Sequence, residues 1–214
     1  LHVWQATADG NLMKAREEVS QLVGRDVELL DLAGCNRATL ESLSENLSDG
    51  VVSPLVWLTL GGIPGMLAFK VISTMDSMVG YRNERYLHFG WFGARVDDLM
   101  NWMPARLAWL LLSISAWILP GYDSRMAWSI GLSQHQYMPG PNAGWGQAAS
   151  AGALRVRLVG KKWKNGRLQH NAWLGHPDDS TEVSANFIPR IICLNRYATL
   201  LLLVILSLLI AIFN

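Results

Sequence analysis

The sequence carries little charge for its length. Lysine, arginine, aspartate and glutamate make up 16% of the 214 residues, and the formal net charge is only +1. Soluble domains usually contain about 25% charged residues, so this composition favours a membrane protein. A chain without a strong positive balance also lacks the electrostatic footprint of a nucleic-acid-binding protein, and we expect no nucleic acid among its partners.

Cysteine is scarce as well. Cys35 and Cys193 are the only two cysteines, and neither belongs to a metal-binding or redox motif. We expect both to be reduced thiols, on the cytoplasmic side or in the membrane. The sequence also contains no phosphate-binding loop, no dinucleotide-binding glycine motif and no zinc-protease motif, so the commonest enzyme signatures do not apply to it.

Apolar residues, by contrast, are abundant. Half of the residues are hydrophobic, the mean hydropathy is +0.18, and there are ten tryptophans, a residue that concentrates where a membrane meets water. Residues 197–213 are uncharged and rich in leucine and isoleucine. Since about 20 apolar residues cross a bilayer, they predict a transmembrane helix. Arg190 and Arg196 precede this helix, which favours a cytoplasmic position for the loop before it.

Residues 51–69 form a second uncharged stretch, but the cluster Gly61-Gly62-Ile63-Pro64-Gly65 interrupts it. Each flank has about ten residues, or roughly 15 Å of helix, which is half of a bilayer. Two interpretations remain open: a kinked span, or a re-entrant hairpin whose turn is buried in protein or lines a wet cavity. We favour the hairpin, because it returns the polar segments before and after it to the same face.

The polar segment before this stretch, residues 37–50, contains three carboxylates, an arginine, an amide and three serines. Glu41 and Glu45 are four residues apart and share a helix face, where like charges repel by a few tenths of a kcal/mol. Either a bound cation or polar substrate favours them there, or the segment is a solvated acidic helix before a membrane segment. Asp49-Gly50 predicts the end of the helix or a turn.

Two further polar segments follow the broken stretch. Residues 73–86 include Asp76, Arg82 and Arg85 within ten residues, and residues 94–106 carry two acids and two arginines. On a helix, Asp97 and Asn101 stack at i, i+4, while Arg95 reaches Asp98 at i+3. These segments are compatible with an interfacial helix with weak internal ion pairs. The apolar residues around them argue for partial burial, and buried charges need a partner or a function.

The rest of the chain completes an expected single membrane-embedded domain over residues 1–214. We expect a soluble amphipathic region with a helix ended by Gly24 (1–36), a motif-bearing core (37–154), a basic polar loop attracted to anionic lipid (155–189) and a C-terminal transmembrane helix (190–214). Within these, we expect a turn-rich loop over 138–146, a small-residue helix over 147–154, and an exposed segment over 168–184. The predicted fold class is all-α: a polytopic integral membrane protein with re-entrant or broken helices and a polar site at the membrane surface.

Four motifs carry a family resemblance. They are Glu41 to Gly50 (ESLSENLSDG), Met75 to Arg82 (MDSMVGYR), Gly93 to Asn101 (GARVDDLMN) with Pro104-Ala105-Arg106, and Pro141 to Trp145 (PNAGW). In this order and spacing they resemble the CobD/CbiB family, the adenosylcobinamide-phosphate synthases of cobalamin biosynthesis. The resemblance runs from about Gly24 to the last helix. Family members have further membrane segments before this region, so we expect this chain to be a partial copy.

The resemblance implies a multi-pass enzyme of the inner (cytoplasmic) membrane. Such an enzyme joins adenosylcobyric acid to an aminoalcohol phosphate, usually (R)-1-amino-2-propanol phosphate, by an amide bond, with ATP and Mg²⁺ as cofactors. The implied partners are the corrinoid substrate, the aminoalcohol phosphate and membrane lipid. A second copy of the chain and other membrane enzymes of the cobalamin pathway are further candidate partners.

The resemblance also implies a set of site residues. Mg²⁺ prefers oxygen ligands, phosphates suit arginine, and removal of the amine proton requires a base. The candidate catalytic acids are Glu41, Glu45, Asp49, Asp76, Asp97 and Asp98, of which Glu45, Asp49 and Asp97 are the candidate metal ligands. The candidate substrate-binding residues are Asn46, Ser48, Arg82, Arg85, Arg95, Asn101, Arg106, Asn142 and Trp145. Which acid is the base stays open.

Two other functions compete with this one. The first is a non-enzymatic AmpE-like membrane protein acting in signalling, but such a relative is expected to lose the carboxylates that this sequence retains. The second is a membrane transporter, since broken apolar segments with buried charges also mark substrate pathways. The absence of paired halves in the sequence disfavours a transporter.

Overall fold

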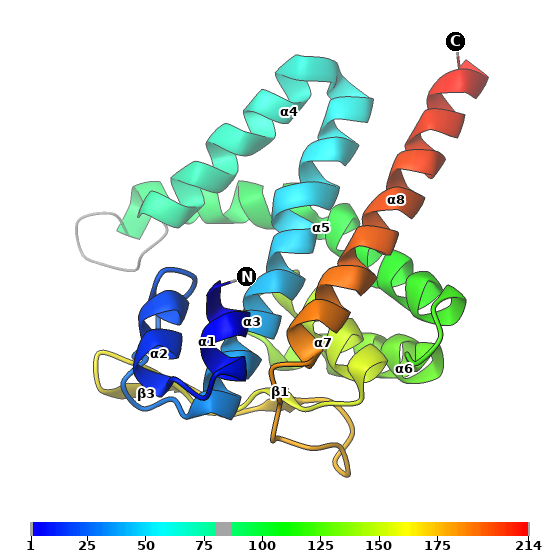
Figure 1. Cartoon of the computed structure of the whole chain (residues 1–214). Helices are drawn as coiled ribbons and strands as arrows, with labels where there is room; N and C mark the ends of the chain where they lie inside the picture. The colour runs from blue at the N-terminus through cyan, green and yellow to red at the C-terminus, as the bar shows by residue number, and fades with distance from the viewer. Residues whose placement is uncertain (1, 80–86, 214) are drawn as a thin grey trace.

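A computed structural model describes residues 2–79 and 87–213, which are mostly helical (Figure 1). The α-helices are α1 (His2–Ala8), α2 (Leu12–Ser20), α3 (Leu32–Leu47), α4 (Ser53–Val79), α5 (Leu87–Ile118), α6 (Ser124–Gln134), α7 (Ala143–Leu154) and α8 (Phe187–Phe213). A π-helical turn, η1 (Ser48–Val52), joins α3 to α4, and a 3-10 turn, η2 (His135–Tyr137), follows α6. The described residues also contain the short strands β1 (Leu158–Val159), β2 (Lys162–Lys164), β3 (Arg167–His170) and β4 (Trp173–Leu174).

The strands correct the expectation of an all-α fold, and they bury part of the segment that was predicted to be exposed before the last helix. Pairing is antiparallel, between β1 and β4 and between β2 and β3. The turn of the second pair is Asn165-Gly166, and both residues have a positive φ, as tight hairpin turns require. Leu158 and Leu174 face each other across the first pair and are fully buried. These two leucines therefore belong to the core, whereas Leu168, Gln169 and Asn171 are exposed.

Helix boundaries also differ from the expected ones. The helix α2 ends at Ser20 and not at Gly24, and α7 begins at Ala143, four residues before the expected start. The acidic helix does not end at Asp49-Gly50, because η1 carries the chain straight into α4. A π-helical segment inside a longer helix is rare and often lies at a functional site.

The helix α3 connects two apolar clusters. It begins at its N-cap residue Asp31, whose carboxylate accepts a hydrogen bond of 2.6 Å from the Gly34 N–H. Its first turns place Ala38 and Leu40 in a cluster with α1, α2, β1 and β4. Its last turn places Leu47 in a cluster with α5, α7 and α8. The polar residues of α3 are thereby held between two packed regions.

The helix α4 reverses direction in its middle. Gly62 has φ +62° and ψ −158°, a backbone conformation that only glycine adopts readily. The chain rises through α3 and the first arm of α4, turns at the top of Figure 1 and descends toward the left of the view. A Cβ atom at Gly65 would lie 2.7 Å from the Trp57 carbonyl oxygen, so the two arms are in close contact next to the turn. The described structure thus contains the reversal on which the hairpin interpretation depends.

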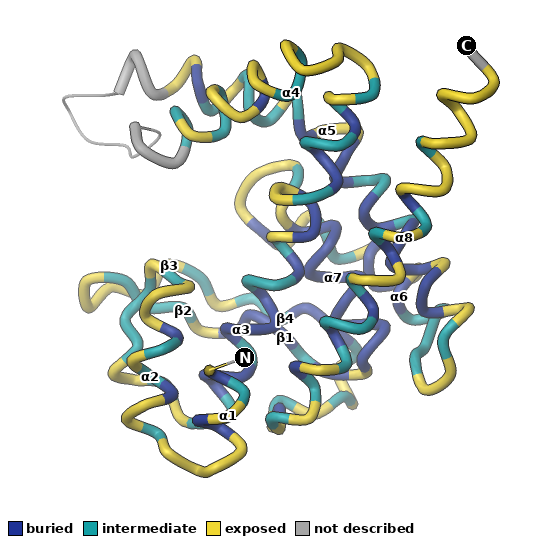
Figure 2. The backbone as a smooth tube through the Cα atoms, turned by 45° about the horizontal axis from the view of Figure 1, so that its top comes forward, coloured by how far each residue is buried: buried dark blue, intermediate teal, exposed yellow. Residues whose placement is uncertain are grey.

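Two helical segments are long and apolar enough to cross a membrane, Leu32–Asp76 and Phe187–Ile212. In the most apolar 18 residues of each segment, only 11% and 22% of the residues, respectively, are buried inside the protein. Figure 2 shows exposed residues along the outer turns of α4 and α8. Among the most exposed are Leu60, Ile63, Leu208 and Ile212. Contiguous exposed apolar surface of this kind marks contact with lipid or protein.

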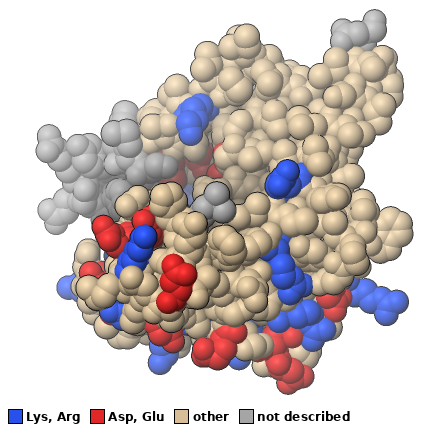
Figure 3. Space-filling model, in the orientation of Figure 1, with Lys and Arg blue, Asp and Glu red and all other residues tan. Residues whose placement is uncertain are grey.

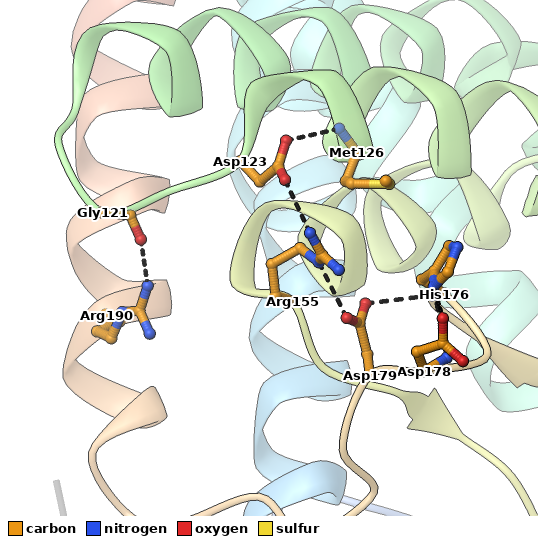
Figure 4. A network of polar contacts seen from close by, with 8 residues as sticks. All are labelled: Gly121, Asp123, Met126, Arg155, His176, Asp178, Asp179 and Arg190. Carbon is orange, nitrogen blue, oxygen red and sulfur yellow. Dashed lines mark hydrogen bonds and ion pairs between the residues drawn. The ribbon is translucent and has the colours of Figure 1, made fainter.

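Opposite these apolar turns, polar contacts hold the loops together (Figure 4). Arg155 ends α7 and donates hydrogen bonds to Asp123 (3.1 Å) and Asp179 (2.9 Å). Asp123 is also the N-cap of α6 and accepts from the Met126 N–H. Part of the predicted basic loop is therefore neutralised within the protein.

Candidate functional site

Acids from separate motifs gather between α3, α4 and α5. Asp49 lies in η1, Asp76 on the returning arm of α4, and Asp97 and Asp98 on α5. Asp49 is close enough to Asp97, Glu45 and Asp76 for their charges to repel, and Asp97 to Asp76 and Asp98. We call these five residues the acidic cluster. Figure 3 shows acidic atoms in a recess beside the arms of α4. The reversal at Gly62 brings the second motif back to the first.

A short hydrogen-bond chain orients Asp97. Asn101 Nδ2 donates to Asp97 Oδ2 at 3.0 Å, and Ser53 Oγ donates to Asn101 Oδ1 at 2.6 Å. The i, i+4 prediction for Asp97 and Asn101 is confirmed. Ser53 and Asn101 are buried, so the carboxylate is held from behind by a rigid support. Its second oxygen, Oδ1, is buried and has no donor among the described residues. A buried acceptor without a hydrogen bond destabilises the folded protein unless a bound ligand interacts with it.

Burial and like charges both act on the acids of α5. Burial raises the pKa of Asp97, and Asp76 and Asp98 raise it further, while the hydrogen bond from Asn101 opposes them. Burial also raises the pKa of Asp98, against the attraction of Arg95, whose guanidinium lies 3.9 Å away. The predicted i+3 contact of Arg95 is therefore confirmed. A bound cation or a transferred proton would relieve the repulsion within this cluster.

The loop before α7 joins the same site. Asn142 Nδ2 donates to the Asp98 carbonyl oxygen at 2.8 Å, and Asn142 Oδ1 is buried without a donor among the described residues. Trp145 stacks on His135 with ring centroids 3.8 Å apart. The guanidinium of Arg106 lies 4.9 Å from the Trp145 ring centroid. Three of the predicted substrate-binding residues thus lie around the start of α7, and His135, which no motif indicated, supports them.

Glu41 lies apart from the acidic cluster. Its Oε2 accepts a hydrogen bond from Arg25 and lies 2.8 Å from the ammonium nitrogen of Lys162. Its Oε1 accepts a hydrogen bond of 3.1 Å from the Val159 N–H. Only 1% of Glu41 is exposed, so a solvated acidic helix is the wrong interpretation at this position, whereas Asp49 at the end of the segment is exposed. Both carboxylate oxygens are engaged by fixed groups, which favours a structural role for Glu41. No sequence signal pointed to Arg25 or Lys162, which are distant in the chain.

The other candidate residues are distributed more widely. Glu45 accepts a hydrogen bond from Gln147 and faces both Glu41 and Asp49. Ser48 is buried in η1. Asn46 is exposed and lines a separate, mostly apolar groove with Asn195 of α8. Arg82 and Arg85 lie outside the described residues, and their predicted roles stay predictions.

No three histidine, cysteine or acidic side chains within 2–79 and 87–213 are grouped as a ready-made metal site. Mg²⁺ in proteins is usually held by one or two carboxylates together with phosphate oxygens and water. The unpartnered Asp97 Oδ1 is an oxygen donor of the kind that this ion prefers. The residues present therefore fit a magnesium ion shared with a phosphate-bearing substrate better than an ion held by the protein alone.

Comparison with known proteins finds one family model and several relatives that all carry the same family name. The family model described as CobD/Cbib protein matches residues 1–194. The cobalamin biosynthesis protein CobD of Yersinia enterocolitica is 42% identical over 208 residues, or 97% of this chain and 64% of the relative. That of Photorhabdus laumondii is 41% identical over 209 residues, or 98% and 65%. That of Pelobacter propionicus is 42% identical over 199 residues, or 93% and 60%.

The chain spans 60% to 65% of the length of these three relatives. No solved structure matches it. The match to the family model includes every motif on which the resemblance was based, from the acidic segment of α3 to the start of α7. This chain belongs to the CobD/CbiB family.

Proposed function

We propose that this chain acts in cobalamin biosynthesis as an adenosylcobinamide-phosphate synthase. In this reaction an amide bond joins adenosylcobyric acid to an aminoalcohol phosphate, (R)-1-amino-2-propanol phosphate, at the expense of ATP. Family membership supports the proposal, as do the names of the relatives. The structural observation that carries it is the acidic cluster, in which carboxylates from three separate segments lie together beside Asn142.

The chemistry explains why such a site is needed. A carboxylate is a poor acyl donor because oxide would have to leave. Transfer of the terminal phosphoryl group of ATP to the carboxylate gives an acyl phosphate and ADP. The amine then attacks the acyl carbon, phosphate leaves with the electrons of the broken C–O bond, and the nitrogen loses a proton to a base. The raised pKa of Asp97 and Asp98 suits a group that accepts this proton.

Individual residues have distinct proposed roles. Glu45, Asp49 and Asp97 are the proposed ligands of Mg²⁺, which supplies neutralisation of phosphate charge when it is bound. The support for Asp97 is its fixed orientation and its unpartnered oxygen. Asp76 and Asp98 complete the cluster, and they are candidates for the base together with Asp97.

Substrate recognition is proposed to involve the arginines and amides around the cluster. Arg95 and Arg106 are cations that suit phosphate oxygens. Asn142 Oδ1 has no donor among the described residues and suits an amide N–H on the rim of the corrin. Trp145 offers an aromatic wall, although only 6% of it is exposed, so its contact with the substrate is at an edge.

The proposed location is the inner membrane, with several membrane segments and a site at the lipid boundary. The two long apolar helices and their exposed outer turns support it. The proposed partners are membrane lipid, a second copy of the chain, and other membrane enzymes of the pathway.

The test is ligase activity in membranes that contain this chain. Labelled aminopropanol phosphate, adenosylcobyric acid, ATP and Mg²⁺ are supplied, and the amide product is measured. We expect ATP-dependent product, lost by at least about a hundredfold in Asp97→Asn and Glu45→Gln, as is typical when a metal ligand or base is removed. Asp178→Asn is the control, since 87% of its side chain is exposed. Product formed without ATP, or equally by the cluster variants and the control, would contradict the proposal.

A further inference from the structure

The helix α7 carries one long polar side chain, Gln147, among residues that are mostly alanine and glycine. Gln147 is fully buried. A Cβ atom at Gly146 would lie 3.1 Å from the Ser44 carbonyl oxygen of α3, so the two helices approach closely at this point. Gln147 and Glu45 are the next residues along the two helices. The close approach therefore brings the amide of Gln147 within reach of the Glu45 carboxylate.

The amide of Gln147 makes one contact and leaves one group unsatisfied. Its Nε2 donates a hydrogen bond to Glu45 Oε1. Its own Oε1 is buried and has no donor among the described residues, which destabilises the fold. An apolar side chain of similar size would avoid this cost. Packing alone therefore does not account for an amide at this position, whereas the hydrogen bond to Glu45 does.

Glu45 and Glu41 are supported in different ways. Glu41 contacts Arg25 and Lys162 through one oxygen and a backbone N–H through the other, so its charge and both oxygens are used within the protein. Glu45 has a neutral donor on Oε1, and none of the described residues forms a hydrogen bond or ion pair with its Oε2. Lys162 and Arg25 attract Glu45 as well, but their close contacts are with Glu41. Of the two acids, Glu45 therefore keeps the charge and the oxygen that a cation needs.

We propose that Gln147 is a positioning residue for the metal ion and acts through Glu45. Its neutral amide fixes one carboxylate oxygen and leaves the negative charge and the other oxygen to the ion. The inference rests on the proposed function, in which Glu45 is a ligand of Mg²⁺ with Asp49 and Asp97. Groups that hold a metal ligand in this way typically contribute about 10–100-fold to metal affinity. The helix α7 then serves the site twice, through Asn142 at its start and through Gln147 one turn later.

The first test is metal binding without turnover. The purified chain in detergent is titrated with Mn²⁺, which prefers the same oxygen ligands as Mg²⁺ and whose free concentration is measured by electron paramagnetic resonance. We expect Gln147→Met, which has a similar length but no N–H donor, to weaken Mn²⁺ binding by about tenfold or more. Ser150→Ala is the matched control, because Ser150 is also fully buried on α7 and its Oγ has no partner among the described residues. Its affinity should equal that of the unmodified chain.

A double-variant cycle tests whether Gln147 acts through Glu45. In a Glu45→Gln chain, Gln147→Met should have no further effect on Mn²⁺ affinity, because the ligand that it positions is already gone. A general structural effect would instead weaken binding to the same extent with or without Glu45. Thermal melting of every variant is compared with that of the unmodified chain. Gln147→Asn keeps the amide but is one carbon shorter, so it is a second variant from which we expect the same loss.

The outcomes separate this inference from the proposed function. Unchanged Mn²⁺ affinity in a folded Gln147 variant, or an equal loss in Ser150→Ala, would overturn the role of Gln147. An unmodified chain that binds no Mn²⁺ would overturn both this role and the proposed metal ligands. A chain that binds Mn²⁺ with the expected dependence on Gln147 and Glu45, but forms no amide in the ligase assay, would support the inference and contradict the proposed function.

Discussion

Ser53 Oγ donates a 2.6 Å hydrogen bond to Asn101 Oδ1 and so joins the first turn of α4 to α5. Asn101 in turn donates a hydrogen bond from Nδ2 to Asp97 Oδ2. A buried pair from two helices thereby sets the direction of an acid in the candidate site. The position of Asp97 depends on helix packing as well as on the local helix, because neither Ser53 nor Asn101 is accessible to water.

Asn101→Ala should change both the stability of the fold and the pKa of Asp97. The change leaves Ser53 Oγ without its acceptor, and loss of a buried hydrogen bond costs about 1–3 kcal/mol. The bond from Asn101 favours the charged form of Asp97, so its loss should raise the pKa of Asp97 further. If Asp97 acts as a base, the acid limb of the rate profile should move to higher pH. Ligase rates across pH, together with thermal melting, measure both effects, and Asn171→Ala at an exposed position is the control.

Glu41→Gln should be among the most damaging substitutions in the chain. It leaves Arg25 and Lys162 partly enclosed without their counter-charge, and breaking a buried ion pair typically costs about 3–5 kcal/mol. The double variant Glu41→Gln with Lys162→Gln should recover part of this loss. Unfolding in detergent by denaturant measures both. A Glu41→Gln protein as stable as Glu182→Gln, an exposed control, would show that the ion pairs do not stabilise the fold.

The contact of Asp123 with Arg155 predicts a pH dependence. Burial acts to raise the pKa of Asp123, but hydrogen bonds from the Met126 N–H and Arg155 outweigh it and leave the pKa below its usual value. A carboxylate with a lowered pKa stabilises the fold above its unfolded pKa of about 3.9, and the benefit disappears as the pH falls through the folded pKa. Asp123→Asn should therefore flatten the decline in melting temperature below about pH 4. An unchanged acid limb would contradict this.

Gly62→Ala should destabilise the reversal of α4. At φ +62° and ψ −158° an alanine is strained by about 1–3 kcal/mol. Gly61→Ala is the matched control, because its φ is not positive and nothing lies within 4 Å of an added Cβ. Melting of both variants in detergent gives the comparison. Equal melting temperatures would mean that the turn adopts another conformation in the protein.

The hairpin also predicts a topology. Cysteines introduced at Asp49 and Asp76 should react with an impermeant thiol reagent from the same side of the membrane, because both acids lie in one cluster. The native Cys35 is buried and should give little background, and the partly exposed Cys193 is replaced by serine before labelling. Reaction from opposite sides would remove Asp76 from the site.

Local features were predictable because they depend on neighbours in the chain. The i, i+4 contact of Asp97 and Asn101 follows from helix geometry alone. The break at Gly62 and the apolar stretch of α8 follow from glycine conformation and from composition. The exception is η1, where the turn signal of Asp49-Gly50 was overruled by packing on both sides: Leu47 and Val52 are both buried.

By itself, the sequence determined the family, the helical majority and which segments carry the polar motifs. Only the tertiary structure decided which polar groups meet: that Glu41 leaves the acidic cluster for Arg25 and Lys162, that Asn142 contacts Asp98, and that residues 158–174 form paired strands. The physical reason is distance along the chain. Periodicity and turn chemistry act over a few residues, whereas these contacts join segments brought together by burial of apolar surface, and burial itself is non-directional.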